Sequence, residues 1–192
     1  MPAEQRLMAR PGGRTEANRK AVADAVLEMV AAGNLLFDAQ DVAGRSGVHR
    51  TTIRRRWPDR DALLTEAMTE HTSRFTVDLS GDWQAVLRKI AFGLRDFMND
   101  PVEDALNRVV AISASDQFTT LVQRHWRRIL VDLAQPLVAA QARGRLARDV
   151  DIQMALATLS STILSYGVYS RRPMEDALVE RLVRQTIRGM NA

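Results

Sequence analysis

Apolar residues recur along most of the chain at intervals of three and four, which is the spacing of one face of an α-helix. Within residues 15–33, for example, Val22, Val26, Met29 and Val30 fall on one side of such a helix. Residue types that favour helices dominate the sequence, and no long run of alternating β-branched residues interrupts them. The pattern therefore predicts an all-α protein.

Capping residues, glycines and prolines divide this pattern into about nine helices. We expect them at about 15–33, 38–46, 49–57, 59–71, 82–99, 102–114, 117–142, 151–170 and 174–189. Pro58 ends the third helix, because a proline disfavours helical geometry in the residue before it. Pro136 falls inside the seventh segment, which we expect to be kinked or divided there.

The second and third helices are short, and a tight turn at Gly47 joins them after a longer first helix. This order is typical of a helix-turn-helix. It predicts three parts of the chain: a flexible basic arm over residues 1–13, a three-helix helix-turn-helix domain over 14–60, and a second helical domain over 61–192.

The third helix has two apolar residues, Ile53 and Trp57, on one side. Its other positions are basic or hydroxylic: Arg50 and Arg54 on one flank, Arg56 on the other, and Thr51, Thr52 and Arg55 opposite. A helix that enters the major groove needs a small apolar anchor and donors that reach phosphates and base edges. We expect Arg50 to pair with guanine, Gln40 with adenine, and Arg60 with the DNA backbone.

Charge supports this interpretation. The 192 residues carry a net charge of +4, but residues 45–60 hold six arginines against the single acid Asp59. Arg6, Arg10, Arg14, Arg19 and Lys20 add basic charge before them. The alternative is a helical small-molecule-binding or protein-interaction module, in which the basic helix is solvated or contacts an acidic partner.

Three stretches resemble a known family: F37-D-A-Q-D-V-A43, S46-G-V-H-R-T-T-I-R-R-R-W57 and P58-D-R-D-A-L-L64. They are similar to the DNA-binding domain of tetracycline-repressor-like (TetR family) transcriptional regulators. The resemblance places Ile53 and Trp57 in the core. It implies that the operator is contacted by Gln40, His49, Arg50, Thr51, Thr52, Arg54, Arg56 and Arg60. The chain departs from the family where Arg54 and Arg56 replace the common Tyr and His, and where Asp38 replaces a Thr cap.

The same resemblance implies that residues 61–192 bind an effector and dimerise. The expected protein is a homodimeric repressor that binds a palindromic operator and is released by a small, mainly apolar effector. We expect the effector pocket to be lined by Phe92, Met98, Ile112, Trp126, Leu130, Met154 and Tyr166. We expect the last two helices to form the dimer interface through Ala155, Leu159, Thr162, Ile163, Leu178, Leu182 and Gln185.

The sequence offers no catalytic or metal-binding constellation. It has no cysteine, and His49, His71 and His125 have no partner at metal-ligand spacing within a helix. Glu66 and Glu70 are one helical turn apart, a spacing more typical of a solvated helix face than of paired catalytic carboxylates. We therefore expect no enzyme, no metal and no cofactor.

A membrane protein is also not expected. Residues 152–170 carry no charge, but their many Ser, Thr and Gln residues suit a protein interface better than lipid. The first residues lack the apolar run of a secretory signal. Together with the absence of cysteine, these features predict a cytoplasmic location.

Overall fold

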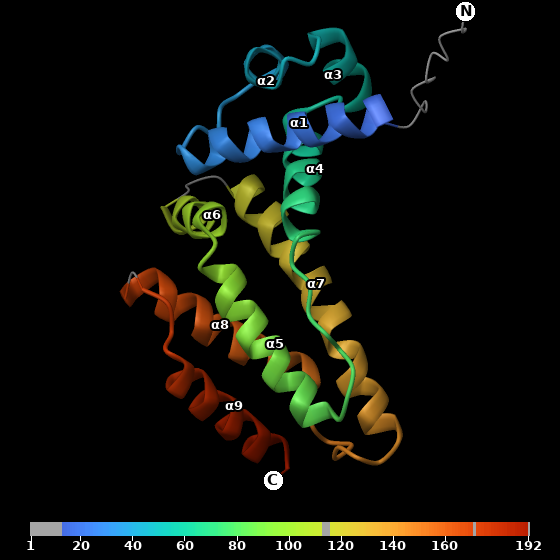
Figure 1. Cartoon of the computed structure of the whole chain (residues 1–192), viewed down its shortest axis with the longest axis vertical. Coiled ribbons are helices and arrows are strands. Elements are labelled where there is room, and N and C mark those ends of the chain that lie inside the picture. The colour runs from blue at the N-terminus through green and yellow to red at the C-terminus, as the bar shows by residue number, and fades with distance from the viewer. Residues whose placement is uncertain (1–12, 113–115, 171, 192) are drawn as a thin grey trace, which may run out of the picture. The chain divides into compact units, whose positions relative to one another are not determined.

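The computed structural model describes residues 13–112, 116–170 and 172–191. These residues form nine helices and no strand, which confirms the all-α prediction (Figure 1). The helices are α1 (Gly13–Ala31), α2 (Ala39–Ser46), α3 (Arg50–Arg56), α4 (Arg60–Thr72), α5 (Trp83–Met98), α6 (Pro101–Ile112), α7 (Asp116–Ala142), α8 (Ile152–Ser170) and α9 (Asp176–Met190). The predicted arm, apart from Gly13, lies outside the described residues.

The chain divides into two compact units, Met1–Thr72 and Ser73–Ala192. The division falls after α4, whereas the sequence pattern places it after residue 60. The reason is that α4 packs along α1 and buries Leu63, Leu64 and Ala67 in the first unit.

The first unit is built around α1, which contacts both α2 and α4, while α3 packs on α2. One face of α1 is buried from Val22 to Val30, as its apolar spacing predicts. Phe37, Val42, Ile53 and Trp57 bring the α1–α2 loop and the two short helices into the same core. On α4, the hydroxyls of Thr65, Thr69 and Thr72 donate to carbonyls one turn earlier in the helix.

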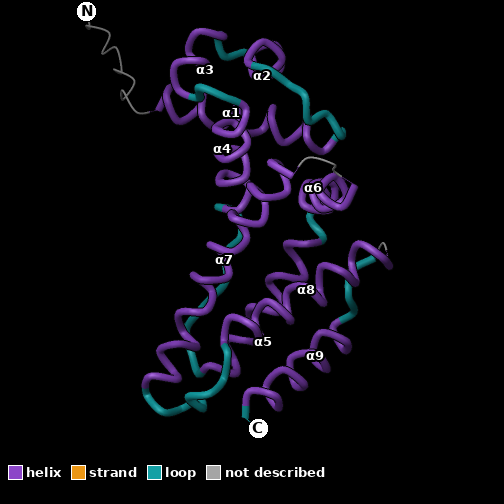
Figure 2. The backbone as a smooth tube through the Cα atoms, turned by 180° about the vertical axis from the view of Figure 1, so that it is seen from behind, coloured by secondary structure: helices purple, strands orange, loops and turns teal. Residues whose placement is uncertain are grey.

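The second unit is organised around α5, which packs against α7, α8 and α9 (Figures 1 and 2). Asp82 caps α5 by accepting hydrogen bonds from the backbone N–H groups of Gln84 and Ala85 at 2.9 and 3.0 Å. The buried residues of α5 recur every three or four positions, as expected for an amphipathic helix. They are Trp83, Val86, Leu87, Ile90, Ala91, Leu94 and Met98.

Pro136 does not divide α7, which continues from Asp116 to Ala142. A proline inside a helix removes one backbone N–H and crowds the preceding turn. The carbonyl left without its helical donor is that of Asp132, an exposed residue, and the Gln135 side chain donates to the neighbouring carbonyl of Val131 at 3.2 Å. The helix therefore continues through Pro136 with one backbone hydrogen bond fewer.

Candidate nucleic-acid interface and apolar cavity

Asp38 begins the helix-turn-helix by capping α2. Its Oδ1 accepts from the backbone N–H groups of Gln40 and Asp41 at 2.6 and 3.0 Å, and Asp41 Oδ2 accepts from the Asp38 N–H at 2.9 Å. The hydrogen bonds from Asp41 and Gln40 hold the pKa of Asp38 below its usual value, with help from Arg54 and Arg50. The departure from a threonine cap thus leaves a fixed carboxylate that stabilises the start of α2.

The turn between α2 and α3 depends on a glycine in the left-handed region. Gly47 has φ +69°, and its N–H donates to the Ala43 carbonyl at 3.1 Å to close α2. His49 then caps α3, because its Nδ1 accepts from the backbone N–H of Thr51 at 3.3 Å. The His49 side chain is therefore used in positioning α3.

The arrangement of α3 matches the pattern expected from its sequence. Ile53 is fully buried and Trp57 is 4% exposed, so both anchor the helix in the core of the first unit. The side chains of Arg50, Thr51, Arg54, Arg55 and Arg56 are exposed, while Thr52 is half-buried. The exposed side of α3 consequently presents hydrogen-bond donors and positive charge.

Gln40 and Arg50 meet at the junction of the two short helices. Arg50 Nη1 lies 3.5 Å from Gln40 Oε1, which is at the outer limit of a hydrogen bond. Both residues line a groove of about 660 Å³ together with Gly47, His49 and Thr51. The structure therefore brings four of the predicted DNA-contacting residues (Gln40, His49, Arg50 and Thr51) into one concave surface.

The three arginines predicted to contact phosphates differ in the contacts that they make within the protein. Arg54 is exposed and lies close enough to Asp38 to lower its pKa. The Arg56 guanidinium lies over the Trp57 ring, 5.2 Å from its centroid. Arg60 Nη1 donates to the Leu35 carbonyl at 2.9 Å, so part of its guanidinium holds the α1–α2 loop.

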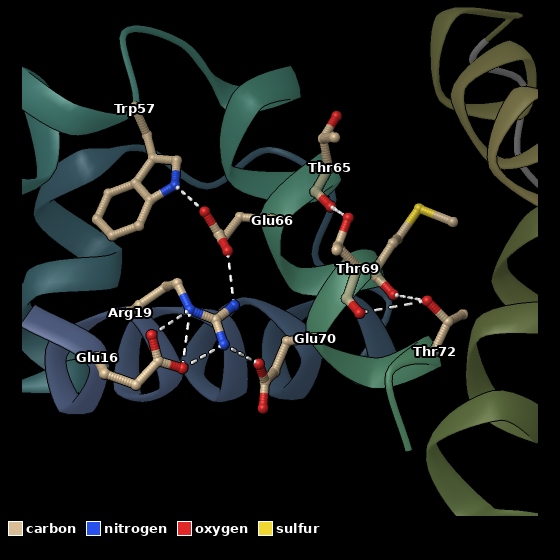
Figure 3. Close-up of polar contacts among 9 residues, drawn as sticks. Glu16, Arg19, Trp57, Thr65, Glu66, Thr69, Glu70 and Thr72 are labelled. Atoms are coloured by element: carbon tan, nitrogen blue, oxygen red, sulfur yellow. Dashed lines mark hydrogen bonds and ion pairs between the residues drawn. The ribbon is translucent and has the colours of Figure 1, made fainter. Parts of the chain in front are cut away.

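Arg19 is the centre of a polar cluster that joins α1, α4 and the end of α3 (Figure 3). Its guanidinium bonds to Glu16, Glu66 and Glu70. The prediction that Glu66 and Glu70 lie on a solvated face is wrong, because their side chains are only 20% and 11% exposed. Arg19, on α1, is thus paired with three carboxylates of the first unit.

The second unit contains a cavity of about 900 Å³ bordered by α5, α6, α7 and α8. Its apolar lining includes Met98, Val122, Trp126, Leu130 and Leu164. Its polar lining is formed by Asn107, Gln123, Arg127, Asp151, Gln153, Ser160 and Ser161. The cavity is therefore large enough for a small molecule and combines apolar walls with several hydrogen-bonding groups.

Four of the seven residues predicted for an effector pocket line this cavity: Met98, Trp126, Leu130 and Met154. Phe92 lies elsewhere, beneath the guanidinium groups of Arg88 and Arg95 at 4.6 and 5.2 Å from its ring centroid. Tyr166 faces a separate hollow on α8, and the Ile112 side chain lies outside the described residues. Of the polar lining residues, the sequence indicates only Arg127, which follows Trp126 directly. The others cannot be predicted, because nothing in their spacing distinguishes them from a solvated face.

The residues predicted for a dimer interface divide into three groups. Leu159 and Ile163 are instead buried in the core of the second unit, at 0% and 2% exposed, so they offer no surface to a partner. Ala155, Leu178 and Leu182 are half-buried against that core. Only Thr162 and Gln185 are exposed.

A different face of α8 is open to solvent. A hollow of about 730 Å³ is lined by residues of this helix alone. They are Met154, Ala157, Thr158, Ser161, Thr162, Ser165, Tyr166, Tyr169 and Ser170. Met154 and Tyr169 are 62% and 87% exposed, so two large side chains of this face are open to solvent.

None of the helices in the described ranges combines the length and apolar character needed to cross a membrane. Within those ranges, no three His, Asp or Glu side chains gather in a group that could hold a metal ion.

Comparison with known proteins identifies the family. The family model described as "Tetracyclin repressor-like, C-terminal domain" matches residues 76–186. The HTH-type transcriptional regulator AqdR of Rhodococcus erythropolis is 23% identical over 151 residues, covering 78% of this chain and 73% of that one.

Solved structures share the fold. Salmonella enterica GusR superposes with a TM-score of 0.68 at 16% identity, covering 98% of this chain and 100% of its own. The fatty acid degradation regulator FadR of Bacillus halodurans also reaches 0.68, at 15% identity, covering 88% and 98%. Members of the matched family are transcription factors rather than enzymes. The chain therefore belongs to the tetracycline-repressor-like (TetR) family and is a DNA-binding transcriptional regulator with a ligand-binding domain.

Proposed function

We propose that this protein is a homodimeric repressor that binds a palindromic operator through α3 and leaves it when a small, mainly apolar molecule occupies the cavity of the second unit. The observation that carries the proposal is the composition of the exposed side of α3. Five exposed side chains there are basic or hydroxylic, and Ile53 and Trp57 on the opposite side are buried in the core of the first unit. A short, anchored, donor-rich helix is what insertion into a major groove requires.

In this proposal the side chains at the α2–α3 junction select bases. Arg50 and Gln40 are adjacent and present groups that pair with guanine and adenine respectively. Thr51 and Thr52 contact a thymine methyl or a phosphate. Arg54, Arg56 and Arg60 contact phosphates, although one N–H group of Arg60 is already occupied by the Leu35 carbonyl.

The dimer is proposed to form through the open face of α8 together with α9. The exposed hollow on α8 has small and hydroxylic residues that allow close helix approach, and Tyr169 projects beside them. Thr162 and Gln185, from the predicted interface, lie on accessible surface. A dyad between two copies would present two α3 helices to a palindromic site.

The effector is proposed to bind in the 900 Å³ cavity, where Trp126 and Leu130 provide apolar contact and Gln123 and Arg127 provide polar contact. Such a molecule can displace the protein from DNA only if it binds the two conformational states unequally. It would stabilise a state in which the two α3 helices are wrongly spaced for the operator.

Selection of bound duplexes from a random pool tests this function. We expect an enriched inverted repeat whose half-sites are about 10 base pairs apart, centre to centre, because that spacing is one turn of DNA. The enriched sequence is called the selected duplex below, and we expect two chains to bind each copy of it. Enrichment of an unpaired half-site would contradict the dimer, and no enrichment would contradict sequence-specific binding.

A further inference from the structure

The recognition helix α3 has only seven residues, which is fewer than two turns. A helix this short is not stable alone, so its orientation depends on the side chains that fix it to the rest of the unit. Ile53 supplies apolar contact, which has little directional preference. Trp57, at the end of the helix, supplies a directional bond as well: its Nε1–H donates to Glu66 Oε2 at 3.0 Å.

Glu66 connects this tryptophan to a second helix. While its Oε2 accepts from Trp57, its Oε1 accepts from Arg19 Nη1 at 2.8 Å (Figure 3). The Glu66 side chain is 20% exposed, so water can replace these partners only in part. Its carboxylate is therefore held between α1 and the end of α3.

Arg19 is itself fixed by two further carboxylates. Glu16 accepts from Arg19 Nε at 2.9 Å and Glu70 accepts from Nη2 at 2.5 Å. The hydrogen bonds that Arg19 donates to Glu16, Glu66 and Glu70 raise the pKa of Arg19 further above its usual value. Because the guanidinium is planar and rigid, these bonds determine where Glu66 can lie.

We propose that Glu66 and Arg19 are positioning residues for base recognition, which act by holding the Trp57 indole and thereby the orientation of α3. Their side chains are 21% and 20% exposed, for Arg19 and Glu66 respectively, and no DNA contact is assigned to either. This inference rests on the proposed function of α3. It differs from a general packing role because it assigns the effect to one N–H···O bond, which can be removed while the aromatic ring is kept.

The test uses the full chain with Trp57→Phe, Glu66→Leu and the double variant. We expect each single change to lower affinity for the selected duplex about tenfold, the effect of losing a hydrogen bond to a charged group. Affinity for random duplex should change less than about twofold, because the exposed arginines are retained. The double variant should bind as the weaker single variant does, since both changes remove the same bond.

Two further variants separate this role from loss of stability. Glu66→Gln keeps an oxygen that accepts from Trp57 Nε1, so we expect affinity for the selected duplex within about threefold of wild type. Glu28→Leu is the matched control, because Glu28 also pairs with an arginine of the first unit, at 3.8 Å, but is 69% exposed. We expect no measurable change in its affinity. Circular dichroism should show equal helix content in all variants.

The bond itself can be observed in the chain labelled with ¹⁵N-tryptophan. The Trp57 indole resonance is identified by its absence in Trp57→Phe, and we expect it to shift and exchange faster with water in Glu66→Leu but not in Glu28→Leu. An unchanged resonance, wild-type affinity in both single variants, or additive losses in the double variant would overturn the inference. If the wild-type protein enriches no duplex sequence, that result contradicts the proposed function. The indole resonance still reports whether the bond between Trp57 and Glu66 exists.

Discussion

Replacement of Arg50 by alanine is expected to lower affinity for the selected duplex by at least about 30-fold, because a dimer loses two bidentate contacts to guanine, each worth about 1–3 kcal/mol. Arg50 is the first residue of α3, its side chain is exposed, and Gln40 lies beside it in the groove between α2 and α3. The preference at one base pair in each half-site should relax, while affinity for random duplex should change little.

Fluorescence anisotropy at one fixed salt concentration measures both affinities. Arg55→Ala is the matched control, because Arg55 is an exposed arginine of the same helix to which no base or phosphate contact is assigned. We expect this control to bind the selected duplex within about twofold to threefold of wild type. If Arg50→Ala kept both the affinity and the base preference of wild type, Arg50 would not be a base-reading residue.

Replacement of Ile53 by alanine is expected to lower the free energy of unfolding by about 2–5 kcal/mol, because it leaves a cavity at a fully buried site. Binding to the selected duplex should weaken in parallel, since α3 loses one of its two apolar anchors. Urea denaturation followed by circular dichroism measures the stability. Leu36→Ala is the control: Leu36 is an aliphatic residue of the same unit that is 86% exposed, so we expect a change below about 0.5 kcal/mol. Equal stability of the two variants would contradict the proposed anchoring.

Local features of the first unit could be predicted because their causes lie close together in the sequence. Asp38 caps α2 through N–H groups two and three residues later, and Gly47 ends α2 by adopting a positive φ. Ile53 and Trp57 are four residues apart and therefore share one side of α3. For such features both partners of the interaction lie within a few residues of each other in the sequence.

The cluster around Arg19 could not be predicted in this way. Arg19 and Glu66 are separated by 47 positions, and only the packing of α4 on α1 brings them together. In the sequence, Arg19 belongs to a basic segment and Glu66 to an ordinary charged helix face. The same limit applies to the domain boundary, because α4 joins the first unit through tertiary contacts that its own residues do not reveal.

The charge-free helix α8 presented a different difficulty. Apolar, small and hydroxylic residues are distributed around its whole circumference, so the pattern does not indicate which side is buried. The pattern is therefore compatible with Leu159 and Ile163 in an interface, but they pack within the unit, while Thr158, Ser161 and Ser165 are exposed. The burial of α8 is decided by α5, α7 and α9, which contact it in the folded unit.

The central claim is that the basic side of α3 binds the DNA backbone and bases, and the salt dependence of binding tests it most directly. Affinity for the selected duplex should be measured between about 50 and 200 mM salt, for wild type and for Arg54→Ala. Each phosphate neutralised contributes about −0.9 to the slope of log affinity against log salt. If only Arg54 acts in each chain of a dimer, the slope is about −2; if Arg54, Arg56 and Arg60 all act, it is about −5.

We predict a wild-type slope of about −5, because Arg54, Arg56 and Arg60 of each chain contact phosphates in the proposed complex. The slope should be about 2 units shallower in Arg54→Ala, because the dimer loses two phosphate contacts. A slope near zero, unchanged by Arg54→Ala, would contradict DNA binding through α3. That result would instead favour a helical module whose basic surface meets an acidic protein partner.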